Sequence, residues 1–429
     1  MGGGGDFLRI LIYGINFSPE LTGIGKYTGE MAEWLAAGGH QVRVVTAPPY
    51  YPEWRLKNEF RNFWNAEVMD CRVAGALRND DDGSLVVYRC PLWVPAKPGG
   101  AKRLLHLASF ALSSFPVLMR QLFRRPDVVW VVEPPLFCAP AAVVVARLSG
   151  ARAWLHIQDY EVDAAFDLGL LKGKLLRGAV AAGERWLMRR FDVVSTISQR
   201  MLARAETKGV TPTALRFFPN WVDLTSYTSC LSVGASAYRR ELNIPEDAVV
   251  ALYSGNMGGK QGLEILAYAA RLCLDFERIV FVFCGNGPGR ADLLARCEGL
   301  PNLRWLDLQP AERLPDLLAM ADIHLLPQRA DAADLVMPSK LTGMLASGRP
   351  IIATAAKGTQ LAEVLAGCGV VTPPGDAVQL ANAIVALADD LPLREQLGQQ
   401  ARAYAETHLE RKAVLLKFEG ALRALVGET

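Results

Sequence analysis

No stretch of this 429-residue sequence reaches the roughly 20 consecutive apolar residues that a helix needs to cross a bilayer. The nearest approach is Leu104 to Met119, which has no formal charge but includes three serines and a proline. Its flanks are basic, with Lys102, Arg103, Arg120, Arg124 and Arg125. Such a segment suits the surface of an anionic membrane, but a buried helix with solvated ends would look the same. We expect no spanning helix and keep both interpretations.

Closely spaced cysteines are also missing. The eight cysteines stand singly, at positions 71, 90, 138, 230, 273, 284, 297 and 368, and several lie in apolar runs. Single buried thiols are typical of core residues in a reducing compartment. The start, Met1 to Gly5, lacks the basic and apolar regions of a signal peptide. We therefore expect a cytoplasmic protein without disulfides, and no Asp/His spacing indicates a metal site.

The charge is nearly balanced overall but uneven along the chain. The net charge of +2 divides into +7 over residues 1–220 and −5 over the remainder. A basic front half favours an anionic partner there, although an ordinary mildly basic surface explains it about as well. We expect an anionic membrane surface or a phosphorylated acceptor at this half, and no nucleic acid.

Short apolar runs alternate with helix-length segments along the chain. The first run, Leu8 to Ile15, precedes a helical pattern from Lys26 and a second run at Gln41 to Thr46, which is the order of a βαβ unit. Further strands are expected near 127–132, 153–158, 192–198, 248–254, 278–284, 303–308, 323–327, 350–355 and 369–372. Residues 50–100 are expected to be irregular.

This rhythm predicts an α/β protein with two doubly wound, Rossmann-like domains. We place an N-terminal domain at 1–220, a C-terminal domain at 221–400, and one long helix at 401–429 that packs back on the first domain. Ligands collect at the carboxyl ends of the strands in such sheets, so the residues that follow each strand are the informative ones.

Three glycine-rich turns follow expected strands, at 23–25, 253–262 and 283–289. Glycine lets the backbone approach a ligand, and a lysine in such a turn suits a diphosphate. The first turn is not G-x-G-x-x-G, which argues against a nicotinamide-dependent dehydrogenase. The candidate ligand-binding residues of the three turns are Gly25, Gly255, Asn256, Lys260 and Gly285.

A fourth candidate segment, 334–341, leads into a helix that should start near Ser339. The helix N-terminus and the Lys340 ammonium would face a second side of the same anion, while Ser339 also caps the helix. The donor-binding candidates here are Asp334, Met337, Pro338, Ser339, Lys340 and Leu341.

In order and spacing these motifs resemble those of the retaining glycosyltransferase family 4, which has the GT-B fold. The similar segments span nearly the whole chain, at 18–27, 39–42, 218–223, 284–288, 314–322, 358–364 and 373–376. Within the family, residues 338–341 with 345–350 are most similar to the enzymes of colanic acid assembly.

The resemblance implies two domains facing each other across a cleft, with a nucleotide sugar bound to the C-terminal one. Lys260 would neutralise the diphosphate, and 334–341 would hold the sugar and phosphates. No metal cofactor is implied, because cationic side chains and helix N-termini stabilise the leaving group. The donor would be GDP- or UDP-linked, and the colanic acid enzymes suggest guanosine and fucose.

The chain departs from the family at its E-x7-E carboxylates, which align with Leu335 and Gly343. Asp334 could replace the first, and Glu363 could lie close to the second. The arginine that usually accompanies the loop lysine is also missing, with Asn256 nearby instead.

In the front domain, residues 154–161 end a strand at its ligand-binding edge. His156 and Gln158 should share a face of that strand. His156 could orient the acceptor or the leaving phosphate, but a lone histidine in a strand is more often structural. Asp159 is the better candidate, as hydrogen-bond acceptor for an incoming hydroxyl.

Together these features predict retaining transfer of a sugar from a nucleotide diphosphate to a lipid-linked saccharide, by a cytoplasmic enzyme that is peripheral on the inner face of the plasma membrane. Two alternatives remain: a sugar-nucleotide epimerase of the same architecture, and an inactive, membrane-associated partner of another transferase. The missing carboxylates motivate the second.

Overall fold

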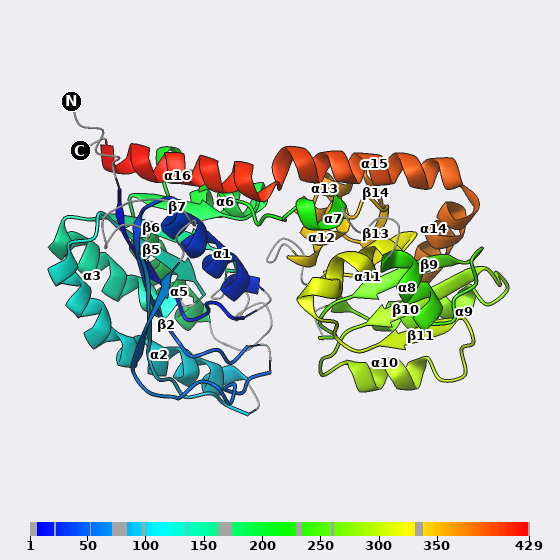
Figure 1. Cartoon of the computed structure of the whole chain (residues 1–429), viewed down its shortest axis with the longest axis horizontal. Helices are drawn as coiled ribbons and strands as arrows, with labels where there is room; N and C mark the ends of the chain where they lie inside the picture. Colours follow the sequence, from blue (N-terminus) through cyan, green and yellow to red (C-terminus); the bar gives the residue numbers. More distant parts are fainter. Residues whose placement is uncertain are drawn as a thin grey trace. The chain divides into compact units, whose positions relative to one another are not determined.

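The computed structural model describes residues 7–20, 23–51, 53–70, 84–96, 99–134, 136–160, 163, 174–228, 234–258, 261–330 and 338–427. The chain forms two compact units. Unit 1 comprises Met1–Pro219 and Leu415–Thr429, and unit 2 comprises Asn220–Val414 (Figure 1).

Unit 1 is built on an eight-stranded sheet in the order β3-β4-β2-β1-β5-β6-β7-β8. All neighbouring strands are parallel except β3, which pairs antiparallel with β4 at the edge. The strands are β1 Arg9–Tyr13, β2 Gln41–Thr46, β3 Asn65–Asp70, β4 Ser84–Arg89, β5 Val128–Glu133, β6 Arg152–Ile157, β7 Val193–Thr196 and β8 Leu215–Phe217. The central strands β5 and β7 are buried along their whole length, as expected for parallel strands covered on both faces.

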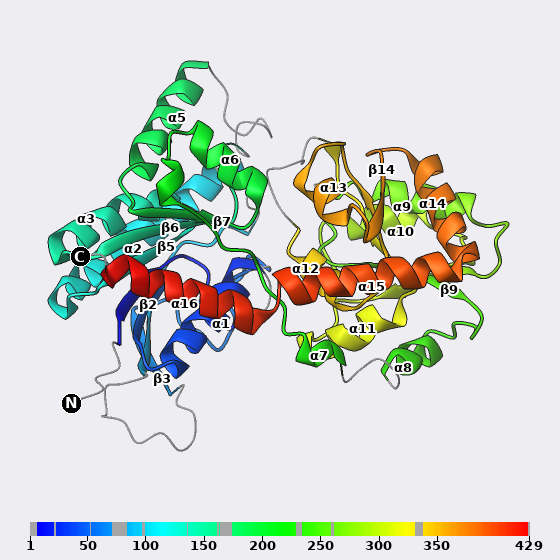
Figure 2. The ribbon, with the colours of Figure 1, turned by 90° about the horizontal axis from the view of Figure 1, so that it is seen from above.

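The helices and 3₁₀ turns of unit 1 are α1 Gly23–Ala37, α2 Gly100–Arg120, η1 Gln121–Arg124, η2 Leu136–Cys138, α3 Ala139–Ser149, α5 Lys174–Met188, α6 Gln199–Thr207 and η3 Pro212–Ala214, with α16 Arg411–Gly427 added from the C-terminus. Figures 1 and 2 both show α16 beside α1. The imidazole of His40 and the indole of Trp34 contact Glu419 at 3.2 and 3.3 Å. The last helix of the chain therefore completes the first unit.

Unit 2 has a fully parallel six-stranded sheet in the order β11-β10-β9-β12-β13-β14. Its strands are β9 Val249–Ser254, β10 Ile279–Cys284, β11 Leu303–Leu306, β12 Ile323–Leu326, β13 Ile351–Thr354 and β14 Gly369–Thr372. Its helices are α7 Thr225–Thr228, α8 Gly234–Glu241, α9 Glu264–Leu272, α10 Arg290–Arg296, η5 Ala311–Arg313, α11 Leu314–Met320, α12 Lys340–Ala346, α13 Gln360–Leu365, α14 Ala377–Asp389 and α15 Leu391–His408. Two apolar clusters of buried residues cover the faces of this sheet.

Two sequence predictions about the elements are wrong. Residues 50–100 are not irregular throughout, because β3 and β4 form there, and β4 alternates half-buried and buried side chains. The single helix expected over 401–429 is two helices. The backbone N–H groups of Lys412 and Ala413 bond to the Glu410 carboxylate at 2.9 and 2.6 Å, so Glu410 caps a new helix instead of continuing α15. Every strand expected from the sequence is present.

The described cysteines are buried free thiols: Cys90, Cys138, Cys273, Cys284, Cys297 and Cys368. None of the helices in the described part of the chain is long and apolar enough to cross a membrane.

Candidate functional site

The glycine-rich turns of unit 2 follow adjacent strands. Strand β9 lies at the centre of the sheet, with β10 on one side and β12 on the other. The chain runs outward from β9 through β10 to β11 and then crosses to β12, so the strand order reverses beside β9. A doubly wound sheet opens a crevice at such a switch point, outside the carboxyl ends of the strands. The turns after β9 and β10 therefore meet at the preferred ligand-binding edge of unit 2.

Two glycines allow these turns to touch. Gly255 has φ 143° and Gly285 has φ 137°, a conformation that residues with a side chain rarely adopt. A Cβ atom on Gly285 would overlap the carbonyl oxygen of Gly255. The N–H of Met257 donates to the carbonyl of Asn286 at 2.9 Å, and the N–H of Gly289 donates to that of Met257 at 2.7 Å. The two turns thus form one rigid backbone platform.

Lys340 points at this platform. Its side chain extends from the start of α12 beside Gly255, where a Cβ atom would lie 3.4 Å from Nζ. Nζ is buried, has no hydrogen-bond partner in the described chain, and lies 4.1 Å from the centroid of the Tyr253 ring. Burial lowers the pKa of Lys340 to about 7. A buried amine without hydrogen bonds is costly, and an anion at the platform would satisfy it.

The other candidates of unit 2 are placed less decisively. Asn256 is exposed at the platform, and its carbonyl accepts a 2.7 Å bond from the Tyr253 hydroxyl. Ser339 occupies the expected N-cap position, but its side chain makes no cap hydrogen bond, which corrects that part of the prediction. Pro338 is half-buried, Leu341 is buried in the core, and Glu363 is exposed on α13. Lys260, Asp334 and Met337 lie outside the described residues.

Two residues of this edge were not singled out from the sequence. Tyr253 is fully buried in β9 and lies under the Lys340 amine. Arg329 follows β12, and its Cγ lies 2.9 Å from the position that a Cβ of Gly262 would take. Arg329 could have been found from the sequence because it comes just after an expected strand, which is the criterion that selected the glycine-rich turns.

In unit 1 the comparable edge contains a buried carboxylate. Glu20 accepts hydrogen bonds from the Asn16 side chain at 2.9 Å and from the backbone N–H groups of Tyr50 and Tyr51 at 3.2 Å. These hydrogen bonds lower the pKa of Glu20, but burial has the larger effect and raises the pKa to about 7. A Cβ on Gly25 would lie 2.6 Å from the Glu20 Cβ, so Gly25 lets helix α1 pack against Glu20. Gly25 therefore has a packing role within unit 1.

Asp159 lies at this same edge, half-buried after β6. Its charge, together with burial as the larger cause, raises the pKa of Tyr51, and the Arg103 guanidinium lowers it. Asp159 and Arg103 are therefore both close enough to affect Tyr51, although the three residues come from three different connections of the sheet. A carboxylate, a phenol and a guanidinium together can bind the hydroxyls of a saccharide.

His156 is part of the core of unit 1. Its ring stacks on Trp130 with centroids 5.4 Å apart, and its nitrogens contact the Ser195 hydroxyl at 2.9 Å and the Gln158 amide at 3.0 Å. Burial lowers its pKa to about 3, so the ring is neutral. The prediction that His156 and Gln158 share a face is confirmed. These contacts fit the structural alternative for His156 and leave it 1 % exposed.

Among the described residues no three His, Cys, Asp or Glu side chains gather as metal ligands. The described groups at the unit 2 edge are glycine backbones and the amine of Lys340, which suit a phosphate group.

Comparison with known families and proteins extends this assignment. Residues 22–221 match the glycosyl transferase 4-like domain, and residues 235–404 match the glycosyl transferases group 1. The chain is 44 % identical over 424 residues to the colanic acid biosynthesis glycosyl transferase WcaI of Escherichia coli K12, covering 97 % of this chain and all of that one. It is 28 % identical to the alpha-D-kanosaminyltransferase of Streptomyces kanamyceticus over 36 % of this chain and 40 % of that one.

Solved structures show the same fold at low identity. Sucrose-phosphate synthase from Thermosynechococcus elongatus has a TM-score of 0.72 at 17 % identity, covering 98 % of this chain and 99 % of that one. Anabaena HepE, solved with UDP and glucose, has a TM-score of 0.66 at 15 % identity, covering 97 % and 99 %. Two parallel-sheet Rossmann-like units are the GT-B fold of these enzymes. The chain therefore belongs to the group 1 glycosyltransferases with a glycosyltransferase 4-like N-terminal domain, and it is a glycosyltransferase.

Proposed function

We propose that this glycosyltransferase moves a sugar from a nucleoside diphosphate donor to a hydroxyl of a lipid-linked saccharide, with retention, during assembly of a surface polysaccharide. The observation that carries the donor assignment is the buried, unbonded amine of Lys340 at the Gly255–Gly285 platform. The identity to a colanic acid biosynthesis glycosyl transferase over the whole length supports the pathway. GDP-fucose is the donor that we propose from the resemblance of residues 338–341 and 345–350 to colanic acid enzymes.

The reaction places its largest developing charge on the departing diphosphate. Positively charged side chains and backbone N–H groups fixed before the reaction stabilise such a charge without reorganisation. We assign this role to Lys340, to Lys260 of the glycine-rich segment 253–262, and to the backbone of the platform. The acceptor proton would pass to the departing phosphate, so neither a protein nucleophile nor a metal cofactor is required.

The acceptor belongs, in this proposal, to the edge of unit 1. Asp159 would accept a hydrogen bond from the incoming hydroxyl, with Tyr51 and Arg103 orienting the saccharide around it. The electrostatic coupling of Tyr51 with both charged groups supports this grouping. We assign His156 a supporting role only, since it holds the end of β6 from within the core.

The lipid end of the acceptor calls for contact with a membrane surface. One face of helix α2 is buried, including Leu107, Phe110 and Leu118. Its other side exposes Leu105, Leu112 and Phe115, at 61, 76 and 45 %. One face of α2 therefore packs in the core, as the buried-helix interpretation expects, and the other face is apolar and exposed. We propose that this exposed face lies on the cytoplasmic membrane surface.

Replacement of Lys260 by alanine tests the donor site. Loss of a cation from a preorganised diphosphate site should lower kcat by roughly 10²- to 10³-fold. Turnover of GDP- and UDP-sugars, after a thermal-shift screen of the same donors, measures the effect, and circular dichroism checks the fold. Activity in a chelating buffer should persist.

Lys412→Ala is the matched control, because Lys412 is exposed on α16 and has no side-chain partner in the described chain. Near-wild-type turnover by the Lys260 variant would overturn the donor assignment. Donor conversion without an acceptor would instead indicate an epimerase, and failure of the wild-type chain to bind any nucleoside diphosphate would indicate an inactive partner protein.

A further inference from the structure

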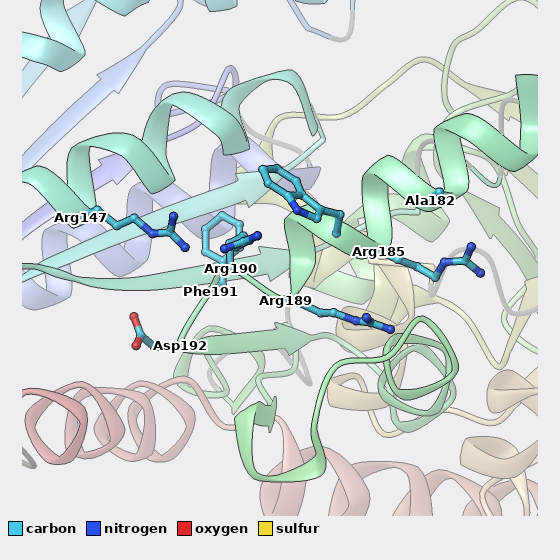
Figure 3. Close-up of a pocket in the computed structure, with 8 residues that line it drawn as sticks. Arg147, Ala182, Arg185, Arg189, Arg190, Phe191 and Asp192 are labelled. Atoms are coloured by element: carbon cyan, nitrogen blue, oxygen red, sulfur yellow. The ribbon is translucent and has the colours of Figure 1, made fainter.

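A hollow of about 660 Å³ in unit 1 is lined by four arginines from two helices and one turn. Arg147 is in the last turn of α3, Arg185 is in the last turn of α5, and Arg189 and Arg190 follow α5. Figure 3 shows Arg147 extending from α3 toward Arg190. We call these four residues with Trp186 the arginine pocket.

The arginine pocket is not part of the candidate site. Helix α3 ends just before β6, and the turn 189–192 leads into β7, so the pocket lies where these strands begin. Asp159 and the other acceptor candidates follow the carboxyl ends of the strands. In a parallel sheet these are opposite edges.

The positive charge of the pocket is not neutralised by the protein. Within the described residues, the guanidinium groups of Arg147, Arg185 and Arg190 have no carboxylate partner and no hydrogen bond. Asp192, the acid at the pocket, accepts the N–H of Ala153 at 2.7 Å and pairs with Arg152 at 3.4 Å. The C-terminal dipoles of α3 and α5 offset only about half a charge each. Four guanidinium groups therefore leave a clear positive excess.

Two of the cations are held in place. Arg190 stacks over the Trp186 ring, with Cζ 4.6 Å from the ring centroid, and Nε of Arg189 donates to the Gly209 carbonyl at 3.1 Å. A fixed planar guanidinium presents paired N–H donors that match phosphate oxygens. The pocket is thus suited to a phosphate more than to a diffuse negative charge.

Exposed apolar side chains accompany the arginines. Trp186, which lines the pocket, is 60 % exposed, and Leu148 and Val144, on the same helix as Arg147, are 66 and 44 % exposed. Tryptophan and leucine beside arginines are typical of surfaces that enter the headgroup region of a membrane, while a soluble phosphate would gain nothing from them. The charge and these exposed apolar side chains together favour a phosphate attached to a lipid.

We propose that the arginine pocket binds the phosphate headgroup of an anionic lipid. This inference deepens the membrane association proposed for α2, on which it rests, and gives unit 1 a second, charge-specific contact with the bilayer. It does not depend on the donor or the acceptor.

Vesicle sedimentation of the full-length protein tests the proposal. The wild-type chain should bind vesicles of phosphatidylglycerol and phosphatidylcholine, and bind pure phosphatidylcholine weakly. Each basic residue near an anionic surface changes partitioning about fivefold, so R147Q/R185Q/R190Q should lower it roughly 100-fold. W186A should lower binding further at constant charge.

The control variant R240Q/K412Q/K417Q removes the same charge from exposed positions elsewhere. It should retain most of the binding, and all variants should keep the wild-type circular dichroism and nucleotide affinity. Failure of the wild-type chain to bind anionic vesicles would overturn the membrane association as a whole. Binding by the pocket variant equal to that of the control variant would overturn the pocket alone. The pocket would also be overturned as a lipid site if calorimetry showed that R147Q/R185Q/R190Q loses binding of inorganic diphosphate while its vesicle binding is unchanged.

Discussion

At the scale of single residues, Lys340 is a side chain whose environment differs from what its type would suggest. A lysine amine normally stays in water, yet Nζ of Lys340 is buried over an aromatic ring with no hydrogen-bond partner in the described chain. Burial favours the neutral amine, and a bound diphosphate would favour the ammonium ion. Donor binding should therefore be coupled to proton uptake above the lowered pKa of about 7.

Substitution of Lys340 by methionine tests this coupling. A hydrogen bond to a charged group is worth about 1.5–3 kcal/mol, so the affinity for GDP or UDP should fall about 10- to 100-fold. The wild-type affinity should weaken as pH rises from 6 to 8, because more of the amine is neutral, and the variant should lose this dependence. Calorimetry in buffers of different ionisation enthalpy measures both.

Thermal unfolding supplies the control for K340M. Without a donor, the buried amine of Lys340 is charged below its pKa of about 7 in the folded protein, and this buried charge lowers the free energy of unfolding. The loss of stability becomes smaller as the pH rises from 7 toward the higher pKa that the amine has in the unfolded chain. Methionine removes the cost and should leave the melting temperature at pH 6 equal or higher. Wild-type affinity with an unchanged pH dependence in K340M would show that Lys340 does not meet the diphosphate.

At the scale of elements, α16 is the helix whose position has the largest consequence. Its Phe418 stacks on Phe218 with centroids 4.3 Å apart, and its edge meets Trp154 at 5.2 Å. These contacts cover the face of β5 and β6 that also carries His156. The chain end therefore supplies part of the core of unit 1, which encloses the strand that presents Asp159.

The variant F418A should destabilise unit 1 by about 3–5 kcal/mol, since it removes a buried aromatic ring and leaves a cavity. Urea unfolding followed by tryptophan fluorescence detects the change, because Trp130 and Trp154 lie beside the ring. On the same helix Leu416 is half exposed, and L416A should change stability by no more than about 0.5 kcal/mol. Equal effects of the two variants would contradict the role assigned to Phe418.

At the scale of the whole molecule, the two units carry different chemistry. Unit 2 contains the platform and Lys340, while unit 1 contains the buried Glu20, Asp159 and the arginine pocket. The uneven charge of the sequence follows the same division, with the basic part in the first 220 residues. Each unit also has its own buried core, so ligand binding to one can be detected separately from the other.

Hydrogen exchange with and without GDP or UDP tests this division. Amides of 255–258, 285–289 and 338–346 should exchange more slowly with the nucleotide, because a bound diphosphate orders the platform and the start of α12. Amides of 14–20 and 158–160 in unit 1 should change little with nucleotide alone. Protection confined to the unit 1 segments would contradict the assignment of the donor to unit 2.

The sequence by itself determined the α/β class, the positions of the central strands, and the turns that form the platform. These are local properties: apolar runs of strand length and glycines after them are visible in a short window. The edge strand β3 and its neighbour β4 were missed because their signal is weaker and the residues around them are rich in proline and tryptophan, and the edge strand β8 was missed because it has only three residues. The break between α15 and α16 was missed because its cause is a single capping carboxylate.

Only the tertiary structure decided the surroundings of the candidate side chains. It buried His156 among aromatic rings and brought Asp159 and Arg103 near Tyr51. It also placed the amine of Lys340 over Tyr253, 87 residues away in the chain. Burial and neighbours across strands determine charge state and access, and neither can be read from the local order of residues. The arginine pocket belongs here too, because its charges come from segments about 40 residues apart that meet only when the sheet has formed.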